Sequence, residues 1–184
     1  MDIRQSGRPA LIRAGQAKRL GLVVVLAIAC AAAAATAHAR ELVSFDARGV
    51  PAGTIVIRTS ERALYLVDGY GAALRYRVAV GQPGKQWYGW SQIDGKYVQP
   101  AWTPPYEVKR DNPRLPDLIP GGSPRNPMGP RALTLSGGEY AIHGTNKPSS
   151  IGSFASYGCI RMLNSDIVDL YERVGVGTRV VVTR

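Results

Sequence analysis

The sequence feature that most limits the size of the folded domain is an uncharged run at residues 21–35, near the amino terminus. Five basic residues and one acidic residue precede the run, and Thr36-Ala37-His38-Ala39 follows it. A basic region, an apolar run and small residues at Ala37 and Ala39 are typical of a secretory signal peptide. We therefore expect residues 1–39 to be a signal peptide, cleaved before Arg40, and residues 40–184 to be one domain.

Two other interpretations of this segment remain open. An uncleaved segment would anchor the protein in a membrane, although a span needs about 20 predominantly apolar residues and this run is shorter and rich in alanine. A lipoprotein would use Cys30, but Ala27 fits a lipobox poorly and the apolar run continues past the cysteine. Membrane contact is expected only if the segment stays attached.

The charge of the remaining chain restricts its partners. Cleavage leaves 145 of the 184 residues, enough to bury roughly two thirds of the unfolded surface. It removes five of 23 basic and one of 13 acidic residues, so the net charge falls from +10 to +6. No Lys/Arg block or RNA-binding motif stands out, and exported proteins rarely meet nucleic acid, so we expect no nucleic-acid partner. The positive charge is explained either by a carboxylate-bearing polymer as partner or by a basic surface that only contacts solvent.

Short runs of branched and aromatic residues between turn residues predict a β-rich domain. The predicted strands are residues 54–59, 62–67, 74–80, 131–135, 139–143 and 179–183. The first three should be consecutive and antiparallel, and the last should close the sheet. Residues 81–130 hold most of the prolines and all three tryptophans, and predict ordered loops with short strands.

One helix is predicted, beginning at Asn164. Asparagine can cap a first turn, and Ile167, Leu170, Tyr171 and Val174 recur at helical spacing. Gly175 should end the helix.

Residues 40–184 contain one cysteine, Cys159, and one histidine, His143, so no disulfide can form within them. A lone thiol in an oxidising compartment is either buried as a small apolar side chain or reactive. Four-coordinate zinc needs more ligands than these two, so we expect no metal or other cofactor. A cysteine nucleophile needs a nearby base, and His143 is the one histidine left to serve.

The residues around this pair resemble the signature of L,D-transpeptidases of the YkuD type. The similarity lies in His143-Gly144-Thr145-Asn146, in residues 149–152 (SSIG) and in residues 156–162 (SYGCIRM). Residues 121–133 and 102–108 are also similar to that family. The resemblance implies a mainly β, sandwich-like mixed sheet, one helix after the cysteine, and a cleft under loops leading to the thiol.

The resemblance also implies a reaction on the tetrapeptide stem of peptidoglycan. His143 would take the thiol proton, and Cys159 would attack the diaminopimelate carbonyl and release D-alanine as a thioester forms. An amine of another stem or of an envelope protein would then take the acyl group, whereas water would give carboxypeptidase activity. Periplasmic location follows from this substrate. A noncatalytic peptidoglycan-binding protein and a general cysteine hydrolase remain alternatives.

The other candidate residues surround the pair. Gly144 allows a turn after His143, and amides at Gly158 and Cys159 could hold an oxyanion. Arg161 could bind a stem carboxylate or form a structural salt bridge.

Two further residues precede the cysteine. Ser156 could orient His143 or the loop backbone, or form a turn. Tyr157 replaces the histidine usual in the family, and would either shape the oxyanion site or merely pack, because a phenol is a poor base at neutral pH.

Overall fold

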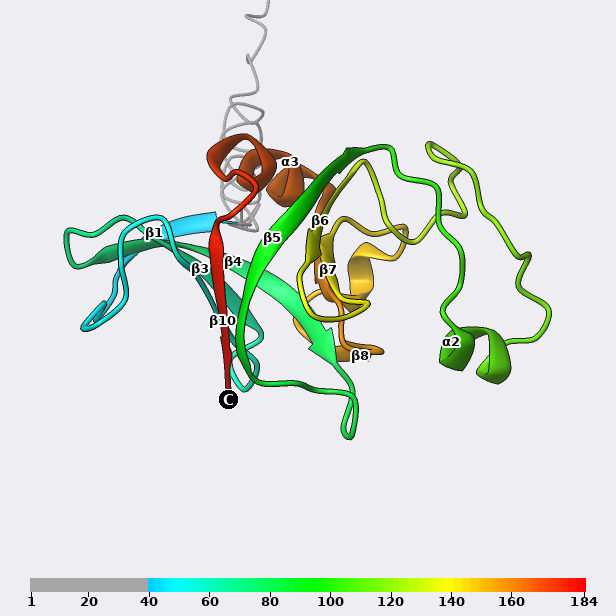
Figure 1. The fold of residues 1–184 in the computed structure, drawn as a ribbon, viewed down its shortest axis with the longest axis horizontal. Helices are drawn as coiled ribbons and strands as arrows, with labels where there is room; N and C mark the ends of the chain where they lie inside the picture. The colour runs from blue at the N-terminus through cyan, green and yellow to red at the C-terminus, as the bar shows by residue number, and fades with distance from the viewer. Residues whose placement is uncertain (1–39) are drawn as a thin grey trace, which may run out of the picture. The chain divides into compact units, whose positions relative to one another are not determined.

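The computed structural model describes residues 40–184, so the predicted signal peptide lies outside the described residues and stays a prediction (Figure 1). The strands are β1 (Arg40–Ser44), β2 (Ile55–Arg58), β3 (Ala63–Val67), β4 (Ala72–Gly81), β5 (Gly89–Val98), β6 (Arg131–Leu135), β7 (Ala141–His143), β8 (Phe154–Ser156), β9 (Ile160–Met162) and β10 (Arg179–Thr183). The helices are α2 (Tyr106–Asp111) and α3 (Asn164–Arg173), with a 3-10 turn at Pro148–Ser150. Within residues 40–184, no helix has the length and apolar character to cross a membrane.

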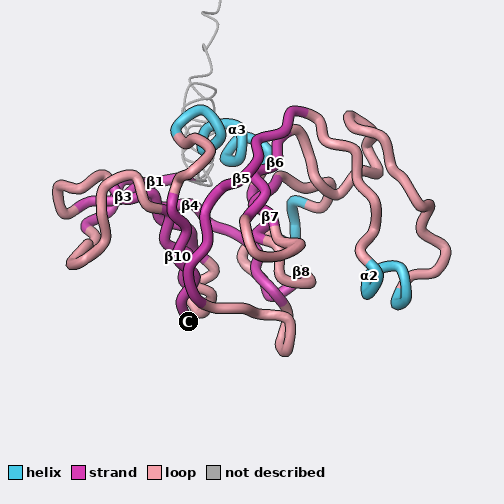
Figure 2. Tube along the Cα trace, in the orientation of Figure 1, coloured by secondary structure: helices cyan, strands magenta, loops and turns pink. Residues whose placement is uncertain are grey.

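The strands, drawn in magenta in Figure 2, form one mixed sheet in the order β1-β4-β3-β2-β10-β5-β6-β7-β9. Most neighbours are antiparallel, but β10 pairs with β2, β9 with β7 and β8 with β4 in parallel. The long strand β4 pairs with β1 and β3 along its first part and with β9 and β8 at its end. Because β4 meets both ends of the strand order, the sheet curls back on itself.

The main core lies inside this curled sheet. Alternate residues of the strands, such as Ile55 and Ile57 of β2 and Val78 and Val80 of β4, point into it and are fully buried. Helix α3 adds its apolar stripe, including Leu170, to the same core. A second cluster on the outer face lies between β2, β3 and the segment after β1.

The sequence-based predictions agree with most of these elements. All six predicted strands are present, β2 to β4 are consecutive and antiparallel, and the mainly β fold with its principal helix after the cysteine is confirmed. The prediction of loops with short strands for residues 81–130 is wrong at β5, a ten-residue strand that joins β10 to β6. The sequence did not predict β5 because Gly89, Gly95 and many exposed residues interrupt the alternation of apolar and polar residues that is typical of a strand.

The predicted start of α3 needs a smaller correction. Leu163, not Asn164, occupies the N-cap position, and no side chain caps the helix. The Asn164 carboxamide oxygen instead accepts a hydrogen bond from the Thr145 backbone N–H at 2.8 Å. The residue therefore ties the helix to the segment that follows His143.

Candidate active site

The register of β7 and β9 brings the two predicted catalytic residues onto one face. Ile142 lies opposite Ile160, and both belong to the core. Because side chains alternate along a strand, His143 and the opposite Arg161 lie on the other face. Cys159 precedes Arg161 by two residues and shares that face. Cys159, His143 and Arg161 all line one cavity of about 830 Å³.

His143 is positioned as a neutral imidazole. Its side chain is 4 % exposed, and its Nδ1 atom has no hydrogen-bond partner among the described residues. Burial, followed by the charge of Arg161, lowers the pKa of His143 to about 4. A neutral imidazole can accept a proton at pH 7, which a general base requires.

The Cys159 thiol is a protonated nucleophile in this resting structure. Its sulfur lies 4.0 Å from the carbonyl oxygen of Glu139. Burial raises the pKa of Cys159, and a backbone hydrogen bond from Ala141 and the charge of Arg161 offset only part of that effect. A base must therefore remove the proton as the sulfur attacks.

Arg161 carries a positive charge with spare hydrogen-bonding capacity. Its Nε atom is buried and has no hydrogen-bond partner among residues 40–184. The expected alternative of a structural salt bridge is not seen for Arg161 in this described part of the chain. The guanidinium is therefore available to a ligand in the cavity.

The turn before Cys159 is held from both sides. Ser156 Oγ donates to the Cys159 carbonyl at 2.6 Å and accepts the Gly158 N–H at 3.1 Å. Trp87 Nε1 donates to the Gly158 carbonyl at 3.1 Å, and its ring stacks on Tyr140. Ser156 thus orients the loop backbone and not His143. Because Ser156 occupies the Gly158 N–H, the expectation that this amide points at an oxyanion is wrong.

Gly144 has a packing role after His143. A β-carbon at this position would lie 2.5 Å from Asn164 Oδ1 and 2.9 Å from Pro130 Cδ. The close approach lets the chain leave β7 beside the start of α3.

Tyr157 lines the cavity that contains Cys159 and His143, and its hydroxyl binds the flanking loop. Its hydroxyl donates to Asp111 Oδ2 of α2 at 2.9 Å, and this bond raises the pKa of Tyr157. The phenol is therefore a neutral donor at pH 7. The expectation that Tyr157 shapes the oxyanion site stays a prediction, and the observed role of its hydroxyl is to bind the loop region that carries α2.

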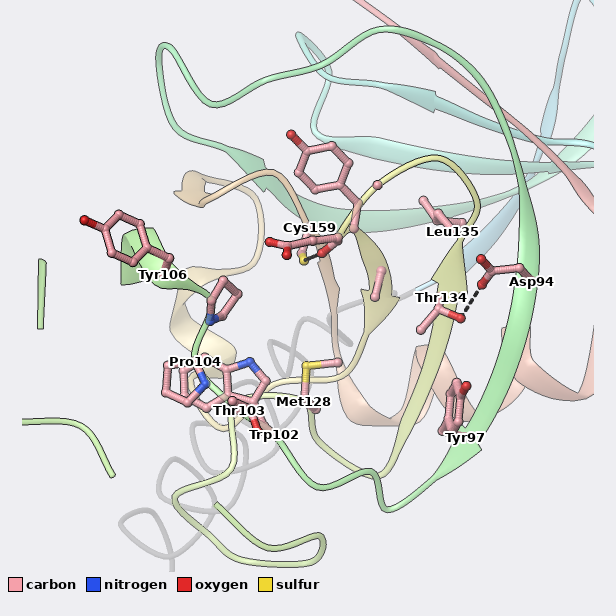
Figure 3. Close-up of a pocket in the computed structure, with 15 residues that line it drawn as sticks. Asp94, Tyr97, Trp102, Thr103, Pro104, Tyr106, Met128, Thr134, Leu135 and Cys159 are labelled. Carbon is pink, nitrogen blue, oxygen red and sulfur yellow. Dashed lines mark hydrogen bonds between the residues drawn. The ribbon is translucent and has the colours of Figure 1, made fainter. Parts of the chain in front are cut away.

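A second cavity, of about 790 Å³, also opens onto Cys159 (Figure 3). In Figure 3 the thiol lies between a wall containing Tyr106 and Pro104 and a wall containing Asp94 and Thr134. Both cavities are bounded by Trp102, Pro105, Tyr106, Met128, Gly138, Glu139, Tyr140 and Cys159. Apart from Cys159, these wall residues were not predicted as site residues; the signals for those within residues 81–130 were the concentration of aromatic residues and prolines and the resemblance of residues 102–108 to the family.

A model of the L,D-transpeptidase catalytic domain, the YkuD family, matches residues 52–182. The chain belongs to this family. The probable L,D-transpeptidase YbiS of Escherichia coli is 41% identical over 133 residues, which cover 68% of this chain and 43% of YbiS. The probable L,D-transpeptidase ErfK/SrfK of Escherichia coli is 37% identical over 135 residues, covering 68% and 42%. The matched region thus spans less than half the length of these curated relatives.

Solved L,D-transpeptidases share the fold. An enzyme from Mycobacterium smegmatis superposes with a TM-score of 0.57 at 16% identity, covering 71% of this chain and 58% of that one. An Enterococcus faecium L,D-transpeptidase gives a TM-score of 0.58 at 16% identity, covering 72% and 50%.

In this L,D-transpeptidase domain, the predicted residues divide into two groups. Cys159, His143, Arg161, Tyr157 and Ser156 line the cavity, and Ser156 also holds the loop backbone, whereas Gly144 and Gly158 allow close packing around the site. Among residues 40–184, no cluster of three or more His, Cys, Asp or Glu residues could hold a metal ion.

Proposed function

We propose that this domain is a peptidoglycan L,D-transpeptidase in which Cys159 forms a thioester with the tetrapeptide stem. The observation that carries the proposal is a cysteine between two cavities, with a neutral histidine on the same sheet face. The family match and the named relatives support the reaction class.

The acylation step follows from the protonation states of the two residues. As Cys159 Sγ attacks the carbonyl at the L-centre of diaminopimelate, its proton passes to His143. The carbonyl oxygen becomes an oxyanion, for which the Cys159 backbone N–H is a candidate donor. The bond to D-alanine then breaks, the leaving amine takes the proton from His143, and a thioester remains.

The second step transfers the acyl group to an amine. The amine attacks the thioester carbonyl, gives a proton to His143, and displaces Cys159 as a thiolate that His143 reprotonates. A diaminopimelate amine gives a 3→3 cross-link, and a lysine of an envelope protein gives an anchored protein. Water as acceptor gives a carboxypeptidase instead.

The two cavities suit a reaction with two substrates. The cavity containing His143 is lined by two basic residues, Arg161 and Lys147, and by two acidic ones, Glu107 and Glu139. Within it, the buried Arg161 Nε has no hydrogen-bond partner among the described residues and favours a stem carboxylate. The other cavity holds Asp94, which favours an ammonium group. We therefore place the acyl donor on the Arg161 side and the acceptor amine on the Asp94 side.

The location follows from the substrate. Peptidoglycan stems lie outside the cytoplasm, and residues 1–39 have the composition of a secretory signal. We propose that the domain is exported and acts in the periplasm.

Intact-mass spectrometry after incubation with purified disaccharide tetrapeptide tests the proposal. The expected result is an acyl adduct with release of D-alanine, absent in Cys159→Ala and strongly reduced in His143→Ala. A folded protein that binds stems without forming an adduct would be a noncatalytic binding protein. Cleavage of ordinary L,L-peptides would instead indicate a general cysteine hydrolase.

A further inference from the structure

Residues 103–118 form a loop, called the flap here, that is closed firmly at its base. Trp102 and Ile119 pair there through two backbone hydrogen bonds of 2.9 and 2.8 Å. The buried Asn126 side chain donates to the carbonyls of Pro100, Ile119 and Pro120 at 2.9, 3.2 and 3.0 Å. These bonds fix the base, so the flap can move as a unit about it.

The tip of the flap has no such anchoring. Helix α2 at the tip (Figure 1) contains no fully buried residue, and Val108 is half-buried, so little apolar packing holds the helix to the sheet. Two polar contacts connect it to the rest of the domain. Lys85 Nζ binds the Glu107 carboxylate at 2.8 and 2.7 Å, and Tyr157 donates to Asp111 at 2.9 Å. Partly exposed contacts of this kind are weak, so they can break and re-form readily.

The position of the flap controls the space in front of the nucleophile. Its residues Pro105, Tyr106, Val108, Asn112 and Leu115 line the same cavity as Cys159. Opening the flap would remove one wall of that cavity, and closing it would hold a bound stem against the thiol.

We propose that Tyr157 is a positioning residue that latches the flap over Cys159 by donating its hydroxyl proton to Asp111. Tyr157 lies two residues before the nucleophile, in the turn that Ser156 and Trp87 hold rigid. The latch therefore joins the fixed thiol loop to the movable wall opposite it. The latch itself does not depend on the proposed function; only the statement that the flap holds a peptidoglycan stem rests on it.

Limited trypsin digestion measures the latch directly, because the flap carries cleavage sites after Lys109, Arg110 and Arg114. We expect Tyr157→Phe to raise the rate of flap cleavage about two- to tenfold, because the loss of one hydrogen bond changes an equilibrium by about this factor. When opening is fast relative to cleavage, this rate follows the open population. The matched control is Tyr70→Phe, because Tyr70 is 95 % exposed and remote from the cavity residues.

A double-mutant cycle assigns the effect to this pair of residues. Asp111→Ala should raise flap cleavage by a similar factor, and adding Tyr157→Phe to it should add little. Alkylation of Cys159 by a bulky maleimide should accelerate in the same variants, with unchanged melting temperatures. Flap cleavage equal to that of the unmutated protein in Tyr157→Phe, or an equal rise in Tyr70→Phe, would overturn the latch.

The stem substrate provides a further readout. Tyr157→Phe should raise KM for the tetrapeptide more than it lowers kcat, because an open flap retains the stem poorly. A larger loss in kcat than in KM would contradict a positioning role. Trypsin and maleimide need no stem, so they decide the latch even if the protein forms no thioester.

Discussion

His143 and Arg161 lie directly opposite each other on the parallel strands β7 and β9. This pairing places a permanent positive charge beside the imidazole, and the guanidinium Nε has no partner of its own among the described residues. A second positive charge on His143 is therefore disfavoured, and the base is kept free of a proton. The same charge faces the cavity and is available to an anionic ligand.

Replacing Arg161 with glutamine should raise the pKa of His143. The pKa should stay below the ordinary value of 6.5, because burial is the larger cause of its depression. Proton NMR titration of the imidazole measures it, and comparison with a His143→Gln variant separates its signal from that of His38. An unchanged pKa would show that Arg161 has no electrostatic influence on the base.

Protonation of His143 should destabilise the fold at acid pH. The folded pKa of about 4 lies below the ordinary value of 6.5, so the folded state binds the proton less well than the unfolded chain. The contribution of neutral His143 to the free energy of unfolding is fully present above pH 6.5. It is lost as the pH falls toward 4, and the loss over this pH range is about 3 kcal/mol. Urea unfolding at pH 7 and 4.5 should show a smaller loss in His143→Gln than in the unmutated protein.

Alkylation of Cys159 by iodoacetamide should speed up mainly at alkaline pH. Burial raises the pKa of this thiol above its ordinary value, so little thiolate exists at pH 7 without substrate. We expect the rate to keep rising through pH 9. A plateau already reached at pH 6 would instead indicate a preformed thiolate and imidazolium pair.

Gly158→Ala should damage both stability and acylation. Gly158 has a φ of +124°, and a β-carbon there would lie 2.3 Å from the Tyr140 ring. Overpacking and backbone strain each cost about 1–3 kcal/mol. Gly175→Ala is the matched control, because no atom beyond the adjacent residues lies within 4 Å of its added carbon, and it should change stability by less than about 0.5 kcal/mol. Thermal and urea unfolding compare the two variants.

The parts of the fold that sequence predicts are those with local periodicity. Residues 179–183 alternate in burial as a strand should, residues 131–135 are rich in apolar side chains, and both segments become strands with the expected bounds. Strand β5 does not show this pattern, because Gly95 lies at a bulge and only Ile93 is buried. Its place between β10 and β6 depends on partners distant in sequence.

The candidate site divides in the same way. Cys159 and His143 could be predicted because one residue of each type remains after position 39. The contacts of Trp87 and Tyr157 could not, because they reach Gly158 and Asp111 across 71 and 46 residues of sequence. Nothing local in the sequence marks such pairs.

Strand β10 determines when the site can exist during folding. It follows the nucleophile in sequence, yet it lies between β2 and β5 in the sheet. Strand β10 is therefore paired with β2, a strand that precedes it by over a hundred residues along the chain. Contacts over such separations form slowly, and β-rich domains of this kind typically fold in milliseconds to seconds. The two halves of the sheet are also joined by β4 and β9, but the junction β2-β10-β5 cannot form until residues 179–183 take their place. We therefore expect the cavity around the Cys159 thiol to be completed only late in folding. Until then the thiol of a newly made chain is more exposed to oxidation than that of the folded protein.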